Sequence, residues 1–303
     1  MRSDFIWMDG DLVPYDQATV HFITPTLHYG LGVFEGIRCY ETAHGPAVFR
    51  LTDHLQRFLE SIHILGIEDF PYNFEDLRLA VFRTIEANRF RTCYVRPLMY
   101  LEGPMGLNMD RSRPRVGIAA WEWGPYLGEE AKQKGIHMMV SSFTRLHPNI
   151  NMTKSKVAGN YVNSMLVKTL ALRSGFDEAV ILDPQGFVAE CTGENLFMVR
   201  KGVVYTPPLT SVLDGITRDT IITLARDMDL TVIEQNFTRD QLYIAEEVFI
   251  SGTAAEVVGV RMIDFRSVNG GGVGPITYSL CQEFDHTVRG VGAHSEEWLD
   301  YGN

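Results

Sequence analysis

The chain has 303 residues, 45% of them hydrophobic and 11% aromatic, which is enough to bury the cores of two domains. Its formal net charge of −11 argues against a nucleic acid as the main partner, because such binding needs a concentrated basic face. The four cysteines are far apart in the sequence and form no C-x-x-C pair, which disfavours a metal site or a disulfide framework. No run is apolar enough for a signal peptide or a membrane span, so we expect a soluble, cytoplasmic protein that does not bind membranes.

The first part of the chain combines strands with two amphipathic helices. The expected elements are, in chain order, a hairpin around Asp9-Gly10, helices at 51–66 and 74–89, and strands at 92–102 and 113–123. Thr52 or Asp53 is the expected cap of the first helix. Leu77, Val81 and Ile85 form the apolar stripe of the second helix. This part of the sequence therefore predicts an α+β domain.

The strand pattern lapses into glycine, proline and charge after residue 123, which favours an interdomain linker. We expect a small domain at 1–124, the linker at 125–134 and a larger domain at 135–303. The elements expected beyond the linker are a strand at 136–143, a helix at 161–175, hairpins at 178–190 and 195–208, a helix at 217–228, a strand at 246–252 and a flexible turn at 269–274.

The stretch GLGVFEG has glycines at 30, 32 and 36, which resembles a dinucleotide-binding fingerprint. Its spacing is G-x-G-x-x-x-G, whereas the Rossmann turn needs its third glycine one residue earlier, at the start of a helix. The residues that follow, IRCYET, continue as a strand. Nucleotide binding is therefore disfavoured.

Three further features bear on chemistry. The stretch NMTKSKVAGNY places Lys154 and Lys156 before an apolar helix, so one of the two amines is a candidate reagent. The turn at 215–217 opens a helix, where backbone N–H groups and the helix dipole can bind an anion. Thr217 could equally be a simple helix cap. Glu190 precedes this turn on a strand and is a candidate acid.

The stretch from Glu190 to Phe197, then Thr206, then the run from Leu213 to Arg218 resembles the long signature of class IV, or fold type IV, pyridoxal-phosphate aminotransferases. The runs LHYGLGVFEGIRCY, CYVRPLMY, AGNYVNS, YTPPLT and SGTAAE are similar to those of branched-chain amino-acid aminotransferases. The resemblance extends to about residue 290. It implies an α+β, two-domain, D-amino-acid-aminotransferase-like fold, with a small N-terminal α/β domain and a larger C-terminal domain that has a β-barrel-like core.

The resemblance implies that pyridoxal 5′-phosphate is the cofactor and that no metal is needed. In the family, the lysine that attaches the cofactor stands five residues before the tyrosine of the Gly-Asn-Tyr step, which selects Lys156 and leaves Lys154 as an ordinary amine. The other cofactor residues that the resemblance implies are Tyr161 at the ring oxygen, Glu190 at the pyridine nitrogen, and Arg57, Ile216, Thr217 and Thr253 at the phosphate. Read from residue type alone, Tyr161 could be a core aromatic, Glu190 an exposed carboxylate and Arg57 a solvated arginine.

The resemblance further implies transamination of leucine, isoleucine and valine with 2-oxoglutarate, in both directions. The implied substrate residues are Tyr29, Phe34, Tyr94, Arg96, Met105, Tyr126, Thr253 and Ala254. Several of these could be plain core residues, and Arg96 could be a structural arginine. A homodimer or a multiple of dimers is implied as well. The alternatives are a D-amino-acid or (R)-amine transaminase, aminodeoxychorismate lyase, and a non-enzymatic binding protein on the same fold.

Overall fold

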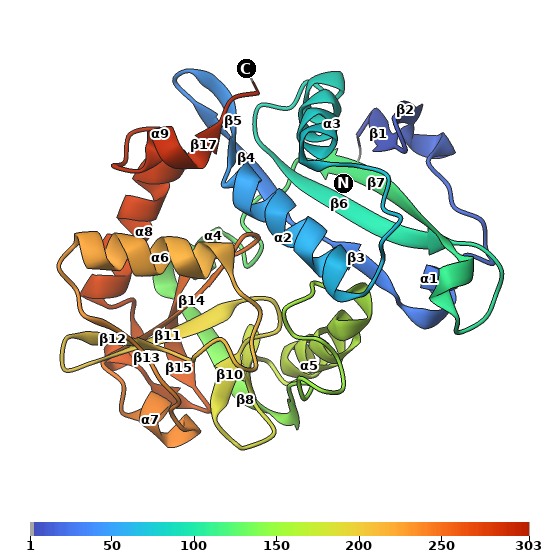
Figure 1. Cartoon of the computed structure of the whole chain (residues 1–303). Coiled ribbons are helices and arrows are strands. Elements are labelled where there is room, and N and C mark those ends of the chain that lie inside the picture. Colours follow the sequence, from blue (N-terminus) through green and yellow to red (C-terminus); the bar gives the residue numbers. More distant parts are fainter. Residues whose placement is uncertain (1–2, 303) are drawn as a thin grey trace. The chain divides into compact units, whose positions relative to one another are not determined.

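The structure is a computed structural model that describes residues 3–302. By its internal contacts the chain divides into two compact units. Unit 1 contains the described residues up to Trp123, the segment Ser155–Gly159 and the described residues from Thr287 onward, and unit 2 contains Gly124–Lys154 and Asn160–His286. Each unit is built on a β-sheet of its own (Figure 1).

The sheet of unit 1 has the strand order β17-β5-β4-β6-β7-β1-β2, with β3 paired to β6 as well. Neighbouring strands are antiparallel throughout. The strands are β1 (Phe5–Met8), β2 (Asp11–Pro14), β3 (Gly32–Phe34), β4 (Ile37–Thr42), β5 (Gly45–Phe49), β6 (Cys93–Glu102), β7 (Arg113–Trp121) and β17 (Leu299–Asp300). The helices are η1 (Tyr15–Gln17), α1 (Pro25–Tyr29), α2 (Leu51–Ile64), α3 (Phe74–Ala87), η2 (Met109–Arg111) and α9 (Ser295–Trp298).

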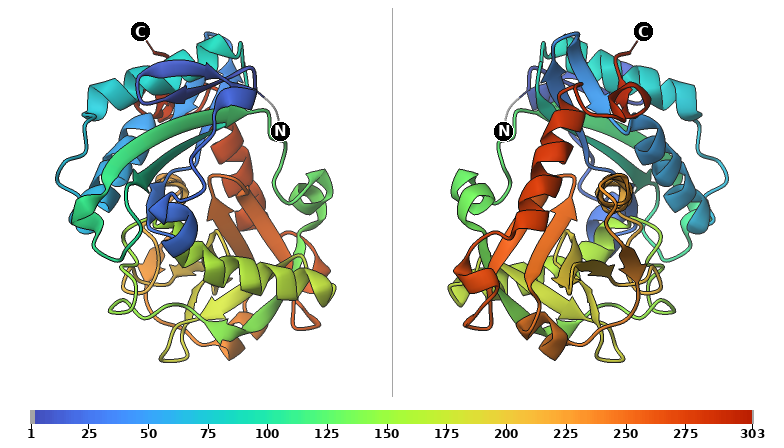
Figure 2. Two further views of the ribbon diagram at one scale, coloured as in Figure 1. Left: turned by 90° about the vertical axis from the view of Figure 1, so that its right-hand side faces the viewer. Right: turned by 90° about the vertical axis from the view of Figure 1, so that its left-hand side faces the viewer.

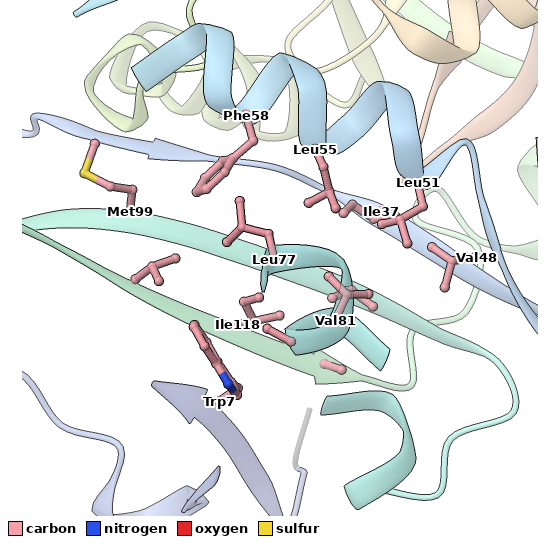
Figure 3. Packing of buried hydrophobic residues seen from close by; sticks show 14 of the residues in the cluster. Trp7, Ile37, Val48, Leu51, Leu55, Phe58, Leu77, Val81, Met99 and Ile118 are labelled. Atoms are coloured by element: carbon pink, nitrogen blue, oxygen red, sulfur yellow. The ribbon is translucent and has the colours of Figure 1, made fainter. Parts of the chain in front are cut away.

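Helices α2 and α3 pack on the sheet of unit 1 and close its core (Figure 3). The predicted stripe of α3 is confirmed, because Leu77, Val81 and Ile85 are all buried. The predicted cap of α2 is wrong. The helix starts after Arg50, which has a left-handed backbone with φ 51° and makes no side-chain cap bond. Asp53 instead forms an ion pair with the Arg50 side chain, at 2.6 Å.

The sheet of unit 2 has the order β10-β9-β8-β15-β14-β11-β12-β13, with β16 paired to β15. It mixes parallel and antiparallel pairs and curls around its core (Figure 2). The strands are β8 (Ile136–Thr144), β9 (Glu178–Leu182), β10 (Val188–Glu190), β11 (Asn195–Arg200), β12 (Val203–Thr206), β13 (Val232–Glu234), β14 (Glu247–Gly252), β15 (Glu256–Ile263) and β16 (Arg266–Ser267). The helices are α4 (Glu129–Lys134), α5 (Tyr161–Arg173), α6 (Ile216–Asp227), α7 (Arg239–Tyr243), η4 (Asn269–Gly271) and α8 (Pro275–Val288), the last two residues of which belong to unit 1. The short helix η3 (Ala158–Asn160) begins in unit 1, and its last residue belongs to unit 2.

Strand β9 lies between two layers of unit 2. Ala179 and Ile181 pack with Val167 and Ala171 of α5, whereas Val180 points into the main core. Helix α5 is apolar on its other side as well, where Val162, Met165, Leu166 and Leu172 are exposed. Within residues 3–302, no helix is both long and apolar enough to cross a bilayer.

The compact units differ from the expected domain ranges in their boundaries. The C-terminal strand β17 pairs with β5, and Asp300 forms two hydrogen bonds with Arg78, at 2.7 and 2.8 Å, so this end of the chain belongs to unit 1. The segment Ser155–Gly159 also belongs to unit 1. The expected linker contains α4, whose Ala131 is buried in the core of unit 2.

The predicted hairpins are confirmed, because β1–β2, β9–β10 and β11–β12 are antiparallel pairs. The α+β fold class is confirmed too. Two cysteines that are far apart in the sequence are neighbours in the fold, since Cys39 and Cys93 are register partners on β4 and β6. Both are free thiols.

Candidate active site

The segment Ser155–Gly159 is bound tightly to the rest of unit 1. The N–H of Phe34 donates to the carbonyl of Lys156, at 3.1 Å, and an antiparallel bridge joins Val157 to β3. The N–H of Lys156 donates to Ser61 Oγ on α2, at 3.0 Å. The Lys156 amine lies 4.8 Å from the centre of the Phe34 ring. The lysine is therefore held by its backbone and its amine lies over an aromatic face.

Lys154 is held differently, by residues of unit 2. Its amine donates to the carbonyls of Leu209 and Val212, the second at 3.2 Å, and lies 3.9 Å from Asp214. Burial lowers its pKa, and the charge of Asp214 opposes this. Because the Lys154 amine binds two backbone carbonyls, it has a structural role in this loop. The two lysines of the loop thus have distinct environments, which supports Lys156 as the reactive one.

Arg57 is not a solvated helix arginine, because only 9% of it is exposed. It pairs with Glu35, which follows β3 and is fully buried. The Arg57 Nε and Nη2 atoms donate to the two Glu35 oxygens, at 2.7 and 2.9 Å. His54 of α2 contacts the same carboxylate.

Phe34, Tyr94 and Arg96 lie together in unit 1. The guanidinium carbon of Arg96 is 4.6 Å from the Phe34 ring centre and 5.3 Å from that of Tyr94. Arg96 Nη2 donates to the Tyr94 hydroxyl, at 3.2 Å. The buried Nε of Arg96 has no hydrogen-bond partner among the described residues. This group therefore pairs an aromatic surface with a cation that has spare hydrogen-bonding capacity.

The remaining candidate substrate residues are more exposed. Tyr29, the last residue of α1, is 47% exposed, and its ring centre lies 6.4 Å from that of His28. Met105, in the loop after β6, is 39% exposed. Tyr126 belongs to unit 2, where the Lys168 amine lies 5.3 Å from its ring centre.

Glu190 ends β10 and is only 6% exposed, so the alternative of an exposed strand-end carboxylate is wrong. Arg145 Nη2 lies 2.5 Å from its Oε1. The N–H of Leu213 donates to its Oε2, at 3.2 Å, and Asn195 Nδ2 donates to the same oxygen, at 3.4 Å. One cation and two N–H donors thus hold the carboxylate.

Asn195 connects Glu190 to the start of α6. Its Nδ2 also donates to the carbonyl of Leu213, at 3.2 Å. A Cβ on Gly215 would collide with the Asn195 side chain, so only glycine fits there. Gly215 is the N-cap and provides no side chain to the helix. The expected cap role of Thr217 is therefore wrong, because this residue lies inside the first turn, where it is 4% exposed.

The turn that contains Thr253 and Ala254 joins β14 to β15. Gly252 precedes it and lies against the loop after Glu190, because an added Cβ would be 3.1 Å from the Gly193 carbonyl. Strand pairing brings Asn195 opposite Ser251 at the same end of the sheet. Glu190, the start of α6 and this turn therefore lie at one end of the sheet of unit 2. Tyr161 is the first residue of α5 and is half-buried.

The glycines of GLGVFEG have structural functions unrelated to nucleotides. Gly30 has φ 76° and accepts, at its carbonyl, a 3.0 Å hydrogen bond from the N–H of Gly159. A Cβ on Gly30 would be 3.3 Å from the Gly159 Cα. A Cβ on Gly36 would collide with the Tyr94 hydroxyl. These glycines let the lysine segment and the Tyr94 side chain approach closely.

Unit 2 also buries two acids beside this end of its sheet. Glu178 pairs with Lys168, at 2.6 Å, and accepts from the N–H groups of Ala179 and Thr192. Glu194 is 4% exposed and accepts from the N–H of Gly193, at 3.1 Å. Burial, and after it the charge of Glu178, raises the pKa of Glu194 to about 8. Glu194 is therefore a neutral acid at pH 7.

Sequence reasoning missed Glu35, His54, Arg145 and Asn195. Glu35, His54 and Arg145 act through partners distant in sequence, and residue type alone does not indicate such pairing. Asn195 lies within the signature that begins at Glu190, which was the one signal available for it.

The sequence profile described as Amino-transferase class IV matches residues 32–263, and the chain belongs to this family. A Pseudomonas aeruginosa protein named branched-chain-amino-acid aminotransferase is 46% identical over 98% of this chain and 97% of its own length. The crystal structure of a T.th. branched-chain amino acid aminotransferase with pyridoxamine 5′-phosphate is similar, at 46% identity and TM-score 0.96, with both chains fully covered. The same enzyme complexed with N-(5′-phosphopyridoxyl)-L-glutamate aligns with TM-score 0.95, at 44% identity and full coverage of both chains.

We predict that Glu194→Gln changes how stability depends on pH. The raised pKa, about 8 against an ordinary 4.5, means that the folded state binds a proton that the unfolded state has released. This contribution is complete below pH 4.5 and is lost as the pH rises through about 8. The free energy of unfolding of the unmodified protein should therefore fall relative to that of the variant, by up to about 1.4 kcal/mol per pH unit in this range. Urea unfolding at a series of pH values measures the difference.

Glu86→Gln, which changes an exposed carboxylate on α3, is the control and should leave the pH dependence nearly unchanged. Parallel stability curves for the unmodified protein and Glu194→Gln would show that Glu194 is ionised in the folded state.

Proposed function

We propose that the protein transfers the amino group of leucine, isoleucine or valine to 2-oxoglutarate and catalyses the reverse reaction, with pyridoxal 5′-phosphate as its cofactor. The observation that carries this proposal is the 46% identity, over 98% of the chain, to a branched-chain-amino-acid aminotransferase. The similar structures with pyridoxamine 5′-phosphate and with a phosphopyridoxyl-glutamate adduct support the cofactor and glutamate as the second amino acid.

The residues of both units suit this cofactor. Helix α6 has no side-chain cap at its first turn, so its N–H groups can bind a phosphate. Arg57 supplies a buried guanidinium from unit 1. Glu190 is a buried carboxylate held by three donors, suited to a protonated ring nitrogen. Lys156 offers an amine on a rigid backbone. We assign the phosphate to Arg57, the amides of Ile216 and Thr217, and Thr253.

Pyridoxal phosphate, when bound, supplies an electron sink for the bonds at the substrate Cα. The Lys156 amine would hold the cofactor covalently through its aldehyde carbon and, once freed by the substrate amine, would move the proton between the substrate Cα and the cofactor C4′. Glu190 would keep the proton on the pyridine nitrogen, and the Tyr161 hydroxyl would donate to the ring oxygen. A neutral amine at Lys156 is the form that can accept this proton.

Phe34 and Tyr94 offer apolar surface to an aliphatic side chain, at about 0.8 kcal/mol per buried CH₂ group. Arg96 pairs with the side-chain carboxylate when glutamate is bound, since an unpaired carboxylate is costly to bury. We assign Tyr29, Met105 and Tyr126 to the substrate as well, and the amides of Thr253 and Ala254 to its α-carboxylate.

The alternatives are a D-amino-acid or (R)-amine transaminase and aminodeoxychorismate lyase. A panel of L-amino, D-amino and (R)-amine donors with 2-oxoglutarate distinguishes them. Leucine, isoleucine and valine should react fastest. A preference for a D-amino acid, or ammonia release without amino transfer, would contradict the proposal.

We also propose that the protein is a homodimer or a multiple of dimers. The exposed apolar face of α5, formed by Val162, Met165, Leu166 and Leu172, supports this, because large apolar surfaces are usually covered in an assembly. A cytoplasmic location remains a prediction, and recovery outside the cytoplasm in cell fractionation would contradict it.

Lys156→Ala should abolish both turnover and covalent attachment of the cofactor, because no other amine replaces it. Lys154→Ala should keep both and lose the hydrogen bonds to Leu209 and Val212 and the ion pair with Asp214. The measurements are the visible absorption of the protein with pyridoxal phosphate and the mass gained after borohydride reduction. The reversed result would mean that the reactive lysine is Lys154.

Arg96→Ala should lower kcat/KM for glutamate and 2-oxoglutarate, with a loss of transition-state stabilisation of about 2 to 4 kcal/mol, the scale of a desolvated charge pair. The loss for leucine should be much smaller. Tyr94→Phe is the matched variant. It removes the hydroxyl that binds Arg96 but keeps the cation, so it should show a smaller loss of the same kind. Single-turnover half-reactions with each amino acid measure the effects separately. Equal losses for leucine and glutamate would rule out this role.

Leu166→Glu should dissociate the dimer, raising its dissociation constant about tenfold or more, because it places a charge in the covered apolar face. Leu79→Glu on α3 is the control, since Leu79 is 55% exposed and Leu166 is 52% exposed. Sedimentation velocity measures both variants. A monomeric unmodified protein would refute the assembly.

A further inference from the structure

A carboxylate, a guanidinium and an imidazole are buried together in unit 1. Glu35 is 0% exposed, His54 1% and Arg57 9%. Both Glu35 oxygens accept hydrogen bonds, Oε1 from Arg57 Nε at 2.7 Å, and Oε2 from Arg57 Nη2 at 2.9 Å and from His54 Nδ1 at 2.7 Å. The N–H of Gly36 adds a fourth bond, at 3.2 Å. Four protein donors therefore hold the carboxylate, one on Oε1 and three on Oε2.

The charges in this triad are defined by their surroundings. Burial alone would raise the pKa of Glu35, but the charge of Arg57 and the hydrogen bond from His54 outweigh it and hold the pKa far below its usual value. Burial lowers the pKa of His54, which is neutral at pH 7 and donates through Nδ1. One negative and one positive charge remain, so the triad is neutral as a whole.

The pairing fixes the plane of the Arg57 guanidinium. Glu35 occupies Nε and one hydrogen of Nη2, which is the side-on geometry of a bidentate pair. Nη1 and the other hydrogen of Nη2 lie on the opposite edge of the same rigid plane and are directed away from Glu35. Rotation of the guanidinium would break two short hydrogen bonds in a dry environment, so its direction is set before any ligand arrives.

We propose that Glu35 is a positioning residue that aims the outer edge of Arg57 at the cofactor phosphate, with His54 fixing Glu35 in turn. This inference rests on the proposed function, through the assignment of Arg57 to the phosphate. It gives the last three positions of the VFEG stretch a role each, because Phe34 lies under the Lys156 amine, Glu35 orients Arg57, and Gly36 leaves room for the Tyr94 hydroxyl.

A positioning role for Glu35 and simple charge balance predict opposite changes in phosphate binding when Glu35 is replaced. Glu35→Gln removes a negative charge near the phosphate, which by itself would tighten phosphate binding. Loss of the bidentate pair lets the Arg57 guanidinium rotate, which weakens phosphate binding. The test is equilibrium dialysis of the apoprotein with pyridoxal phosphate and, separately, with pyridoxal, which lacks the phosphate. The ratio of the two dissociation constants is the phosphate selectivity.

Glu35→Gln should lower the phosphate selectivity by about 10- to 100-fold while pyridoxal binding changes little, the usual scale for loss of a residue that orients a ligand-binding group. Arg57→Gln should lower it at least as much. In the double variant, Glu35→Gln should add nothing further, because it acts only through Arg57. Unchanged or increased selectivity in Glu35→Gln, or additive losses, would overturn the proposal.

His54 provides a second test that leaves the charge unchanged and applies even if Glu35→Gln does not fold. His54→Asn places an amide N–H near the position of Nδ1 and should keep most of the selectivity. His54→Leu removes the donor and should lose several-fold more. Equal selectivity in the two variants would overturn the proposal. Failure of the unmodified protein to bind pyridoxal phosphate would refute the proposed function itself, whereas full selectivity in Arg57→Gln would refute only the role of Arg57 and of its two partners.

Discussion

The backbone of the Ser155–Gly159 segment is the constraint on which the site in unit 1 depends. Its hydrogen bonds to β3 and to Ser61 fix Lys156 relative to Phe34, which in turn contacts Arg96. A flexible lysine side chain can reach many positions, so its reactivity becomes specific only when its Cα is fixed. The close contact of Gly30 with Gly159 serves the same end, since any larger residue at Gly30 would push the segment away.

Both units contain buried carboxylates that each have a cation at hydrogen-bonding distance. Glu35 has Arg57, Glu190 has Arg145 and Glu178 has Lys168. Glu194 is buried beside the last pair and is neutral. Charges arranged before a ligand binds cost no reorganisation during reaction, which is the main source of electrostatic catalysis.

Sequence patterns predicted what depends on neighbours along the chain. The hairpin at Asp9-Gly10 and the stripe of α3 were found because turn chemistry and helical periodicity are local. Family resemblance added Lys156 and Glu190 as candidates. The partners of these residues were not found, because Arg145 lies 45 positions from Glu190 and no local pattern encodes that distance. The cap of α2 was misplaced because Arg50 adopts a left-handed backbone that non-glycine residues rarely take.

The discontinuity of unit 1 has a consequence for the order in which the protein folds. Its sheet takes an edge strand, β17, from the end of the described chain, and its lysine segment arrives only after β8 of unit 2 has been made. During synthesis, therefore, the described residues up to Trp123 can collapse around α2 and α3, but the nascent sheet still lacks β17, which pairs with β5 on the side opposite β4. Assembly of the lysine segment on unit 1 is thus necessarily a late event, and premature release of the chain would leave an exposed strand edge open to aggregation.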